Sequence, residues 1–139
     1  MIRLTRRYGF SAAHRLHAPH LSEEANRQLY GKCNNPYGHG HNYVLEVTVR
    51  GEVDPKTGRV VDVGKLDAWV RERILEDFDH RDFNRDVPEF SELIPTTENI
   101  VRVIGRRLCH GWRERFGALQ LHRIRVEETA KNFFELRQV

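Results

Sequence analysis

The feature that most constrains the fold is a largely alternating stretch at residues 42–50, directly after a His-X-His pair. Its apolar residues occupy every second position: Tyr43, Leu45, Val47 and Val49. This period of two predicts a strand with one face on the core. If the strand begins at the histidines, His39 and His41 point to that same face. Two neutral imidazoles that converge there would make half of a zinc site.

A third histidine lies in an earlier alternating stretch, residues 2–16, whose apolar residues fall mostly on even positions. His14 shares that parity, so the pattern places it on the inward face. A single inward histidine is more often a hydrogen-bonded core residue than a ligand, and an isolated His-X-His pair is often a surface feature. Three histidines on two strands instead match catalytic zinc, in which a fourth position stays open for substrate or water. His17 and His20 follow in loop sequence and have no assigned role.

A thiol precedes the His-X-His pair by six residues, across a segment rich in turn formers. The asparagine, proline and glycine residues between Cys33 and His39 allow the thiol to fold back toward a metal without being tied to the register of the strand. The other cysteine, Cys109, lies beside the apolar stripe of a predicted helix. Two cysteines in such different contexts give no disulfide framework, so we expect both to be reduced.

The composition limits the class of protein. A length of 139 residues with 39% hydrophobic side chains predicts a single domain, residues 1–139, with a modest core. The formal charge is only +3, and the scattered arginines suit solvated faces or a small phosphate-bearing substrate better than a nucleic acid. No apolar run approaches the roughly 20 residues of a membrane helix. No signal-peptide core follows Met1, so we expect a soluble cytoplasmic protein that binds neither nucleic acid nor membrane.

Periodicity and capping residues predict the elements of the fold. In chain order they are strands at 2–16 and 39–50 with a short helix at 22–30 between them, a return strand at 60–63, helices at 65–78 and 95–117, and strands at 121–128 and 132–136. The return strand follows from an Asp-Pro and Thr-Gly loop at 53–59, which is typical of a hairpin. The short helix is expected to cover the histidines from outside.

Two further groups offer chemistry. Glu128 shares a face with the apolar Ile124 and Val126, so a carboxylate falls where a core residue is expected, and burying it unpaired is costly. It either pairs with an arginine, which is the commoner case, or anchors a ligand rich in N–H donors such as a pterin or purine. Asp79 and His80 are adjacent at the end of the first long helix. Such a pair is frequent by chance in so charged a chain, but a helix exit suits a catalytic loop.

Six sequence blocks resemble, in order, those of the family of 6-pyruvoyltetrahydropterin and 6-carboxytetrahydropterin synthases: FSAAHRL, CNNPYGHGHNY, the DPKTG loop, FDH, PTTEN and VEET. The resemblance covers nearly the full chain. It implies an α+β tunnelling fold (T-fold), a four-stranded antiparallel sheet with two long helices on one face, assembling into a trimeric barrel. It also implies a hexamer of two stacked trimers with active sites at subunit interfaces. Unpaired sheet edges in so small a domain give a physical reason to close a ring.

The resemblance also implies roles for individual residues. One zinc ion per subunit would be held by His14, His39 and His41. Cys33 would be the thiol that abstracts a proton. Asp79 and His80 would be a relay pair from a neighbouring subunit. Glu128 would anchor the pterin ring. The residues lining its pocket would be Thr96, Thr97 and Glu98. The chain has Phe78 where the family usually has leucine, an apolar exchange that puts little in doubt.

The implied reaction converts 7,8-dihydroneopterin triphosphate to 6-pyruvoyltetrahydropterin and eliminates triphosphate. Zinc would act as a Lewis acid on the side-chain hydroxyls, and its charge would favour the thiolate form of Cys33, which can then act as a base. No redox cofactor is implied, because the pterin ring gains the reducing equivalents that the substrate side chain loses. Magnesium could accompany the triphosphate, although no motif marks it. Lys32, Arg81 and Arg85 are nearby candidates for contacts to the triphosphate.

Two other functions stay open at this point. The 6-carboxytetrahydropterin synthases of the family act on the same substrate in the deazapurine route to queuosine and release acetaldehyde. Their cysteine typically stands closer to the histidine pair, so the six-residue spacing from Cys33 to His39 favours the pyruvoyl enzyme. The other is a non-catalytic pterin or purine binder with structural zinc, which would need neither Cys33 nor the Asp79–His80 pair.

Overall fold

The computed structural model describes residues 1–137 and 139, and its centre is a mixed five-stranded sheet with the strand order β3-β1-β2-β4-β5. The strands are β1 (Ile2–His14), β2 (His39–Gly51), β3 (Arg81–Asp82), β4 (Gln120–Thr129) and β5 (Asn132–Arg137). Four of them pair antiparallel in a row. The two-residue β3 adds a short parallel edge beside β1. The prediction of a purely antiparallel, four-stranded sheet is therefore wrong at this edge.

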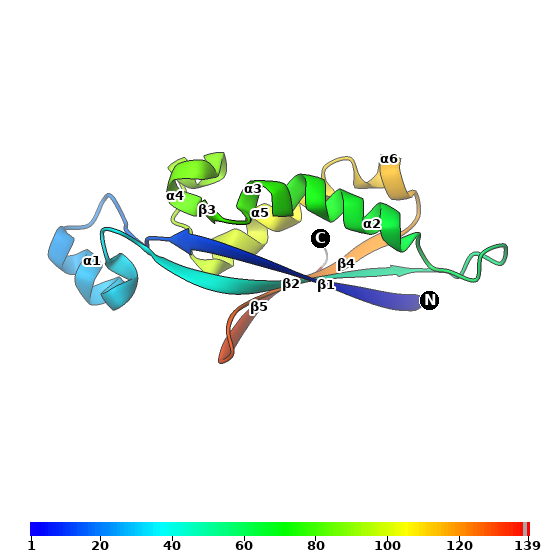
Figure 1. Ribbon diagram of the computed structural model, residues 1–139, viewed down its shortest axis with the longest axis horizontal. Coiled ribbons are helices and arrows are strands. Elements are labelled where there is room, and N and C mark those ends of the chain that lie inside the picture. Colours follow the sequence, from blue (N-terminus) through cyan, green and yellow to red (C-terminus); the bar gives the residue numbers. More distant parts are fainter. Residues whose placement is uncertain (138) are drawn as a thin grey trace.

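The helical segments α2, α3, α5 and α6 lie on one side of the sheet, and α1 lies beyond the end of it that carries His14 and His39 (Figure 1). In chain order the segments are α1 (Glu23–Tyr30), the 3₁₀ turn η1 (Gly31–Asn34), α2 (Val63–Val70), the π-helical η2 (Arg71–Leu75), α3 (Glu76–Phe78), α4 (Phe83–Asp86), the 3₁₀ turn η3 (Pro88–Ser91), α5 (Thr97–Cys109) and α6 (Trp112–Phe116). The stretch α2–η2–α3 and helix α5 are the two long helices that the sequence predicts. Among the described residues, no helix is both long and apolar enough to cross a membrane.

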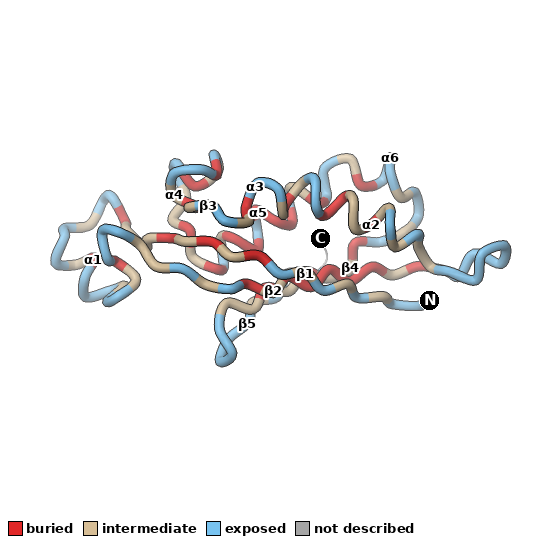
Figure 2. Tube along the Cα trace, in the orientation of Figure 1, coloured by how far each residue is buried: buried red, intermediate tan, exposed pale blue. Residues whose placement is uncertain are grey.

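The core lies between the sheet and these helices (Figure 2). Along β2 the predicted inward residues Tyr43, Leu45, Val47 and Val49 are confirmed, since all are at most 1% exposed. The opposite face, predicted to be open, is covered as well, because Glu46 and Thr48 are only 8% and 4% exposed. The helices contribute a buried stripe that packs on them in one apolar cluster: Leu66, Ile74, Phe78, Ile100, Ile104 and Leu108. Burial of a Leu, Ile or Phe side chain contributes about 1.5–3 kcal/mol, so this stripe holds the helices on the sheet.

The predicted return strand at 60–63 is wrong. The loop before it closes with a single bridge between Asp54 and Arg59, and no strand follows. Instead, the Asp62 carboxylate accepts a hydrogen bond from the Lys65 N–H at 3.2 Å and caps a helix that begins at Val63. The N-cap thus outweighs the strand preference of the valines that precede and open the helix.

The second long helix also ends earlier than predicted, at Cys109 rather than near Gly117. Gly111 has a φ of 78°, a left-handed conformation that glycine adopts without steric cost and that cannot continue a helix. The chain then forms the separate short helix α6. The predicted last two strands and the turn between them are confirmed as β4 and β5.

Candidate metal centre and active site

Three histidines from two neighbouring strands meet at one end of the sheet. The antiparallel register places His39 directly opposite His14, and His41 opposite Ala12 on the same face. The ring centroids are 4.6, 4.8 and 5.1 Å apart. One ligand atom of each ring lies within 4.8 Å of the other two. Strand pairing therefore brings the predicted ligands together as a group that could hold a metal ion, called the histidine triad below.

The hydrogen bonds of His14 decide which of its nitrogens is free. Nδ1 lies 2.8 Å from the carbonyl oxygen of Pro95, and because a carbonyl only accepts, Nδ1 carries the proton. Nε2 keeps its lone pair and lies 3.0 Å from Nε2 of His39. Burial lowers the pKa of His14 to about 4, although the Pro95 hydrogen bond works in the opposite direction. The ring is therefore neutral near pH 7, the form that ligates metals.

Two other nitrogens of the triad are buried without a partner. They are Nδ1 of His39 and Nε2 of His41, and buried polar atoms are rarely left unpaired. Burial lowers the pKa of His39, and the charges of His41 and Lys32 lower it further. Ligand nitrogens around tetrahedral zinc are about 3.3 Å apart, close to the 3.0 Å between His14 and His39. Closely spaced imidazoles, one kept neutral by burial and the other two each with an unpaired buried nitrogen, fit a metal with the chemistry of zinc.

Cys33 lies on η1, which is tied to the chain just after His14. The Leu16 N–H donates to the Cys33 carbonyl at 2.8 Å, and the side chain of Asn34 donates to the Leu16 carbonyl at 2.7 Å. Gly38 has a φ of 74°, and a Cβ there would lie 3.1 Å from the His14 carbonyl oxygen, so no larger residue suits this approach. The Cys33 residue is only partly buried. The turn therefore holds an accessible thiol against the residues that follow His14.

Asp79 and His80 are docked on the edge of β1. The Asp79 carboxylate accepts a hydrogen bond from the Ser11 N–H at 2.9 Å, and the His80 N–H donates to the Ser11 carbonyl at 2.6 Å. This backbone contact also draws the next two residues along β1 as the parallel strand β3. The two side chains pair at 3.1 Å, but that of His80 is 83% exposed. Among the described residues, no hydrogen bond joins this relay pair, Asp79 and His80, to Cys33.

His80 has the backbone angle φ 61°, unusual for a residue other than glycine. The Ser11 N–H, and after it His80, lower the pKa of Asp79. The pair therefore has a carboxylate at one end and an exposed imidazole at the other. Such a pair can orient an imidazole and move a proton through it. Its exposure leaves that imidazole free to meet a group outside its own chain.

Glu128 occupies the extra position of a bulge in β4. Pairing with β5 passes from Glu127 opposite Phe133 to Thr129 opposite Asn132, so Glu128 has no directly opposed residue on β5. The Glu128 carboxylate accepts a hydrogen bond from the hydroxyl of Thr97 on α5. Among the residues that the structure describes, the pairing with an arginine that the sequence leaves open is not found, and the arginines of β4 pair with Glu46 instead.

The segment 95–98 connects the histidine triad to this carboxylate. The Pro95 carbonyl holds the first histidine, Thr96 caps α5 through its side-chain oxygen, and Thr97 bonds the bulge carboxylate. Glu98 is exposed in the first turn of α5. Thr96 and Thr97 thus have structural partners already, and Glu98 is the most accessible of the predicted pocket residues.

The predicted site residues therefore fall into separate groups within one chain. The groups are the histidine triad, Cys33 on its turn, Asp79 with His80, and Thr97 with Glu128. Sequence reasoning missed the residues that position them: Ser11, Asn34, Asn84 and the carbonyl of Pro95. These act through backbone groups or side-chain amides, whose partners no spacing reveals. Three histidine ligands that leave a fourth position open are typical of catalytic rather than structural zinc sites.

Comparison with known proteins agrees with this class of site. The chain matches the family model for 6-pyruvoyl tetrahydropterin synthase over residues 3–139. A 6-pyruvoyl tetrahydrobiopterin synthase of Poecilia reticulata is 46% identical over 129 residues, 93% of this chain and 85% of that protein. The one of Homo sapiens is 43% identical over 129 residues, 93% and 86% of the two chains. The structure of Caenorhabditis elegans 6-pyruvoyl tetrahydropterin synthase matches with a TM-score of 0.88 at 38% identity, covering 99% of this chain and 96% of that one.

The chain therefore belongs to the 6-pyruvoyl tetrahydropterin synthase family. Its α+β fold is the fold of that family. The second group considered from the sequence matches over a shorter stretch. A 6-carboxy-5,6,7,8-tetrahydropterin synthase of Rickettsia conorii is 38% identical over 80 residues, which make up 58% of this chain and 49% of that protein.

Proposed function

We propose that this chain is a zinc-dependent 6-pyruvoyl tetrahydropterin synthase, a lyase that converts 7,8-dihydroneopterin triphosphate to 6-pyruvoyltetrahydropterin and releases triphosphate. The observation that carries the proposal is the histidine triad, three closely spaced imidazoles of which that of His14 is buried, with the partly buried Cys33 on the adjoining turn. The family and the names of relatives that are 43% and 46% identical support it. The overall reaction is a rearrangement with elimination, so it needs no oxidant or reductant.

His14, His39 and His41 would hold the zinc ion. When bound there, zinc supplies Lewis-acid chemistry to hydroxyl groups of the substrate and leaves a ligand position open. The rings are prepared for this role, because the Pro95 carbonyl fixes the tautomer of His14 and burial keeps that ring neutral. A magnesium ion, if used, would arrive with the triphosphate.

Cys33 would act as the base that removes a proton from the substrate side chain. Its turn is held by Leu16 and Asn34, which fixes the position of the thiol while leaving it partly exposed. Asp79 and His80 would pass protons to and from that thiol. Because the His80 side chain is 83% exposed and not bonded to Cys33, we assign the relay pair of one chain to the thiol of a neighbouring chain. The trimeric barrel, and the hexamer of two such trimers, that the family resemblance implies would place the active sites between chains.

Glu128 would anchor the pterin ring. A carboxylate can accept two parallel hydrogen bonds from the N–H groups of an amino-pyrimidinone edge. The Thr97 hydroxyl holds this carboxylate in place, and the absence of an arginine partner among the described residues leaves it able to accept from a ligand. Thr96 and Glu98, at the start of the same helix, would line the pocket.

The runner-up is the 6-carboxytetrahydropterin synthase reaction, with the same substrate but with acetaldehyde as a product. The spacing of six residues between Cys33 and His39 and the shorter match to that group both favour the pyruvoyl enzyme. The two reactions share the metal, the thiol and the pterin anchor. Only the product separates them.

Product analysis tests the proposal. The zinc-loaded protein is incubated with 7,8-dihydroneopterin triphosphate, and the pterin product is identified by mass spectrometry beside a Cys33→Ala control. We expect 6-pyruvoyltetrahydropterin without acetaldehyde, and no product from the variant. 6-Carboxytetrahydropterin with acetaldehyde would assign the chain to the runner-up function. Unchanged substrate would mean that the chain only binds a pterin.

A further inference from the structure

A hollow of about 330 Å³ between α1 and η1 is lined by an excess of positive side chains. Arg15, Arg27 and Lys32 border it, together with a single carboxylate, Glu23. Among the described residues, no carboxylate oxygen lies within ion-pair distance of any of the three cations. Like charges that gather without a counter-charge repel each other, so this arrangement favours an anionic ligand.

Some arginines elsewhere in the fold are instead paired with carboxylates. Arg107 pairs with Asp77 and with Glu89, each at 2.6 Å. Arg6 pairs with Asp67 at 2.8 Å. Those guanidinium groups are occupied in the protein itself. Among the described residues, the cations of the hollow make a single hydrogen bond, from Arg15 to a carbonyl, so their other donors are available to a ligand.

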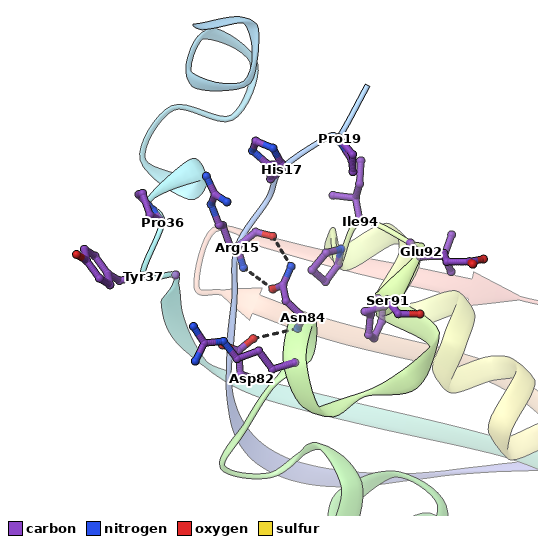
Figure 3. Close-up of a pocket in the computed structure, with 15 residues that line it drawn as sticks. Arg15, His17, Pro19, Pro36, Tyr37, Asp82, Asn84, Ser91, Glu92 and Ile94 are labelled. Carbon is purple, nitrogen blue, oxygen red and sulfur yellow. Dashed lines mark hydrogen bonds and ion pairs between the residues drawn. The ribbon is translucent and has the colours of Figure 1, made fainter. Parts of the chain in front are cut away.

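The backbone beneath Arg15 is fixed by the amide of Asn84. The Arg15 N–H donates to Oδ1 of Asn84 at 2.7 Å, and the Asn84 amide nitrogen donates to the Arg15 carbonyl at 3.0 Å (Figure 3). The Arg15 side chain points away from this clamp toward the turn that carries Pro36 (Figure 3). Its Nε donates to the Asn34 carbonyl at 3.2 Å, which leaves the terminal nitrogens free. The guanidinium is therefore preorganised before any ligand binds.

The other two cations stand on equally constrained backbone. Arg27 is in the last turn of α1, where its carbonyl accepts a hydrogen bond from the Gly31 N–H. The same helix is tied to Ala18 by the buried amide of Asn26, with bonds of 2.7 and 3.0 Å. Lys32 lies on η1, directly before Cys33. The hollow is thus a preformed concave site whose charged walls come from three segments.

This hollow adjoins the proposed reaction centre. Arg15 directly follows the ligand His14, and Lys32 directly precedes Cys33. The positive charge of Lys32 also lowers the pKa of His39. The hollow is therefore joined through the backbone to both the histidine triad and the thiol.

We propose that Arg15, Arg27 and Lys32 form the subsite for the triphosphate group of the substrate. The inference rests on the proposed function, and it extends that function to the charged end of the substrate. Guanidinium forks and an ammonium group match phosphate oxygens, and together they offset much of the charge of the chain of phosphates. In the substrate the triphosphate is attached to the carbon next to the hydroxyl-bearing carbons, so it lies beside the group that the metal would hold. Positive charge there also stabilises the leaving group as its bond breaks.

The structure separates Lys32 from the other two candidates considered from the sequence. Arg85 pairs with Asp82 at 3.9 Å, and its side chain is 83% exposed. Arg81 borders a different hollow, in which Asp82 and Asp86 supply negative charge. Neither position offers the uncompensated positive charge that a triphosphate requires.

Binding of inorganic triphosphate to the zinc-loaded protein tests the subsite without requiring turnover. Isothermal titration calorimetry compares the natural protein with Arg27→Gln and Lys32→Gln. Lys56→Gln and Arg59→Gln are the matched controls, because they remove the same charge from the exposed loop at 53–59. We expect each subsite variant to weaken binding by about tenfold, as loss of a charge-assisted contact does. The loop variants should bind like the natural protein.

Kinetics with the full substrate supply the second measurement. Arg27→Gln and Lys32→Gln should lower kcat/KM for 7,8-dihydroneopterin triphosphate by a similar factor. Their affinity for 7,8-dihydroneopterin, which lacks the phosphates, should be unchanged. Equal weakening by the loop controls, or subsite variants that bind triphosphate normally, would overturn the subsite even if turnover is normal. Triphosphate binding that depends on these residues in a protein without turnover would support the subsite and refute the proposed function.

Discussion

The histidine triad and the relay pair are built in opposite ways. The triad is complete within one chain, because the β1–β2 register sets His39 opposite His14, and burial keeps the His14 ring neutral. The relay pair, Asp79 and His80, is held to the backbone of Ser11 and carries an imidazole whose side chain is 83% exposed. Strand pairing thus brings the possible metal ligands together within one chain, whereas the relay pair has no hydrogen bond to Cys33 among the described residues.

The largest expected effect comes from removing a ligand of the triad. His39→Ala should lower zinc affinity by more than about 100-fold, beyond the 10- to 100-fold typical of losing an outer-shell partner. Product formation should be lost with the metal. Metal analysis after dialysis measures the first effect. The matched control His20→Ala, an exposed histidine in the loop after β1, should keep one zinc ion per chain.

Removing the thiol should separate chemistry from metal binding. We expect Cys33→Ala to keep its zinc and to lose turnover by about 10²- to 10⁴-fold, the range for loss of a general base. Cys109→Ala, which removes an exposed thiol on α5, should leave turnover unchanged. A Cys33 variant with normal turnover would assign the base to another group.

The relay pair should matter for catalysis but not for the fold. His80→Gly removes the imidazole and places glycine at a φ of 61°, where it is the least strained residue. Turnover should fall by about 100-fold, while the melting temperature stays equal or rises. A clear fall in the melting temperature would instead show that His80 supports the edge of the sheet.

The pterin anchor should give a smaller, binding-specific effect. Glu128→Gln should weaken substrate binding by about tenfold or more, because hydrogen bonds to a charged group contribute about 1.5–3 kcal/mol. The adjacent Glu127→Gln is the matched control, since Glu127 pairs in register with Val44 and does not occupy the bulge. Equal effects of the two changes on KM would argue against a specific anchor.

The smallest expected effect is a pH dependence of the docking of Asp79. The Ser11 N–H lowers the pKa of Asp79 below its ordinary value of 3.8. A depressed carboxyl pKa adds stability that is present above the ordinary pKa and is lost as the pH falls through the folded value. Between about pH 5 and pH 3 the natural protein should therefore lose more thermal stability than Asp79→Asn. Parallel melting curves across this range would remove the link between ionisation and docking.

The sequence predicts the triad well because its information is local. Parity along two strands places His14, His39 and His41 on one face, and the alternation needed no knowledge of partners elsewhere. Parity likewise placed Glu128 toward the helices. It did not predict the bulge or the Thr97 hydrogen bond, because strand pairing with β5 and packing of α5 decide them.

Other features depend on competing interactions, which hydrophobic periodicity does not reveal. The valines at 60–63 suggest a strand, but the side chain of Asp62 caps a helix at that point. The short edge strand β3 exists because Asp79 and His80 form hydrogen bonds with the backbone of Ser11. The Ser11–Asp79 contact spans 68 residues of sequence. Contacts of this length between a side chain and a backbone group leave no periodic signal.

The central claim, that one chain supplies the metal and thiol while another supplies the relay pair, can be tested by complementation. Cys33→Ala and His80→Gly chains with different tags are co-expressed, and oligomers that carry both tags are purified and assayed. Each variant alone should be nearly inactive. In mixed rings about a quarter of the sites would pair an intact thiol with an intact relay, so activity should recover to about that fraction. Mixed oligomers as inactive as the separate variants would contradict the claim and place thiol and relay in the same chain.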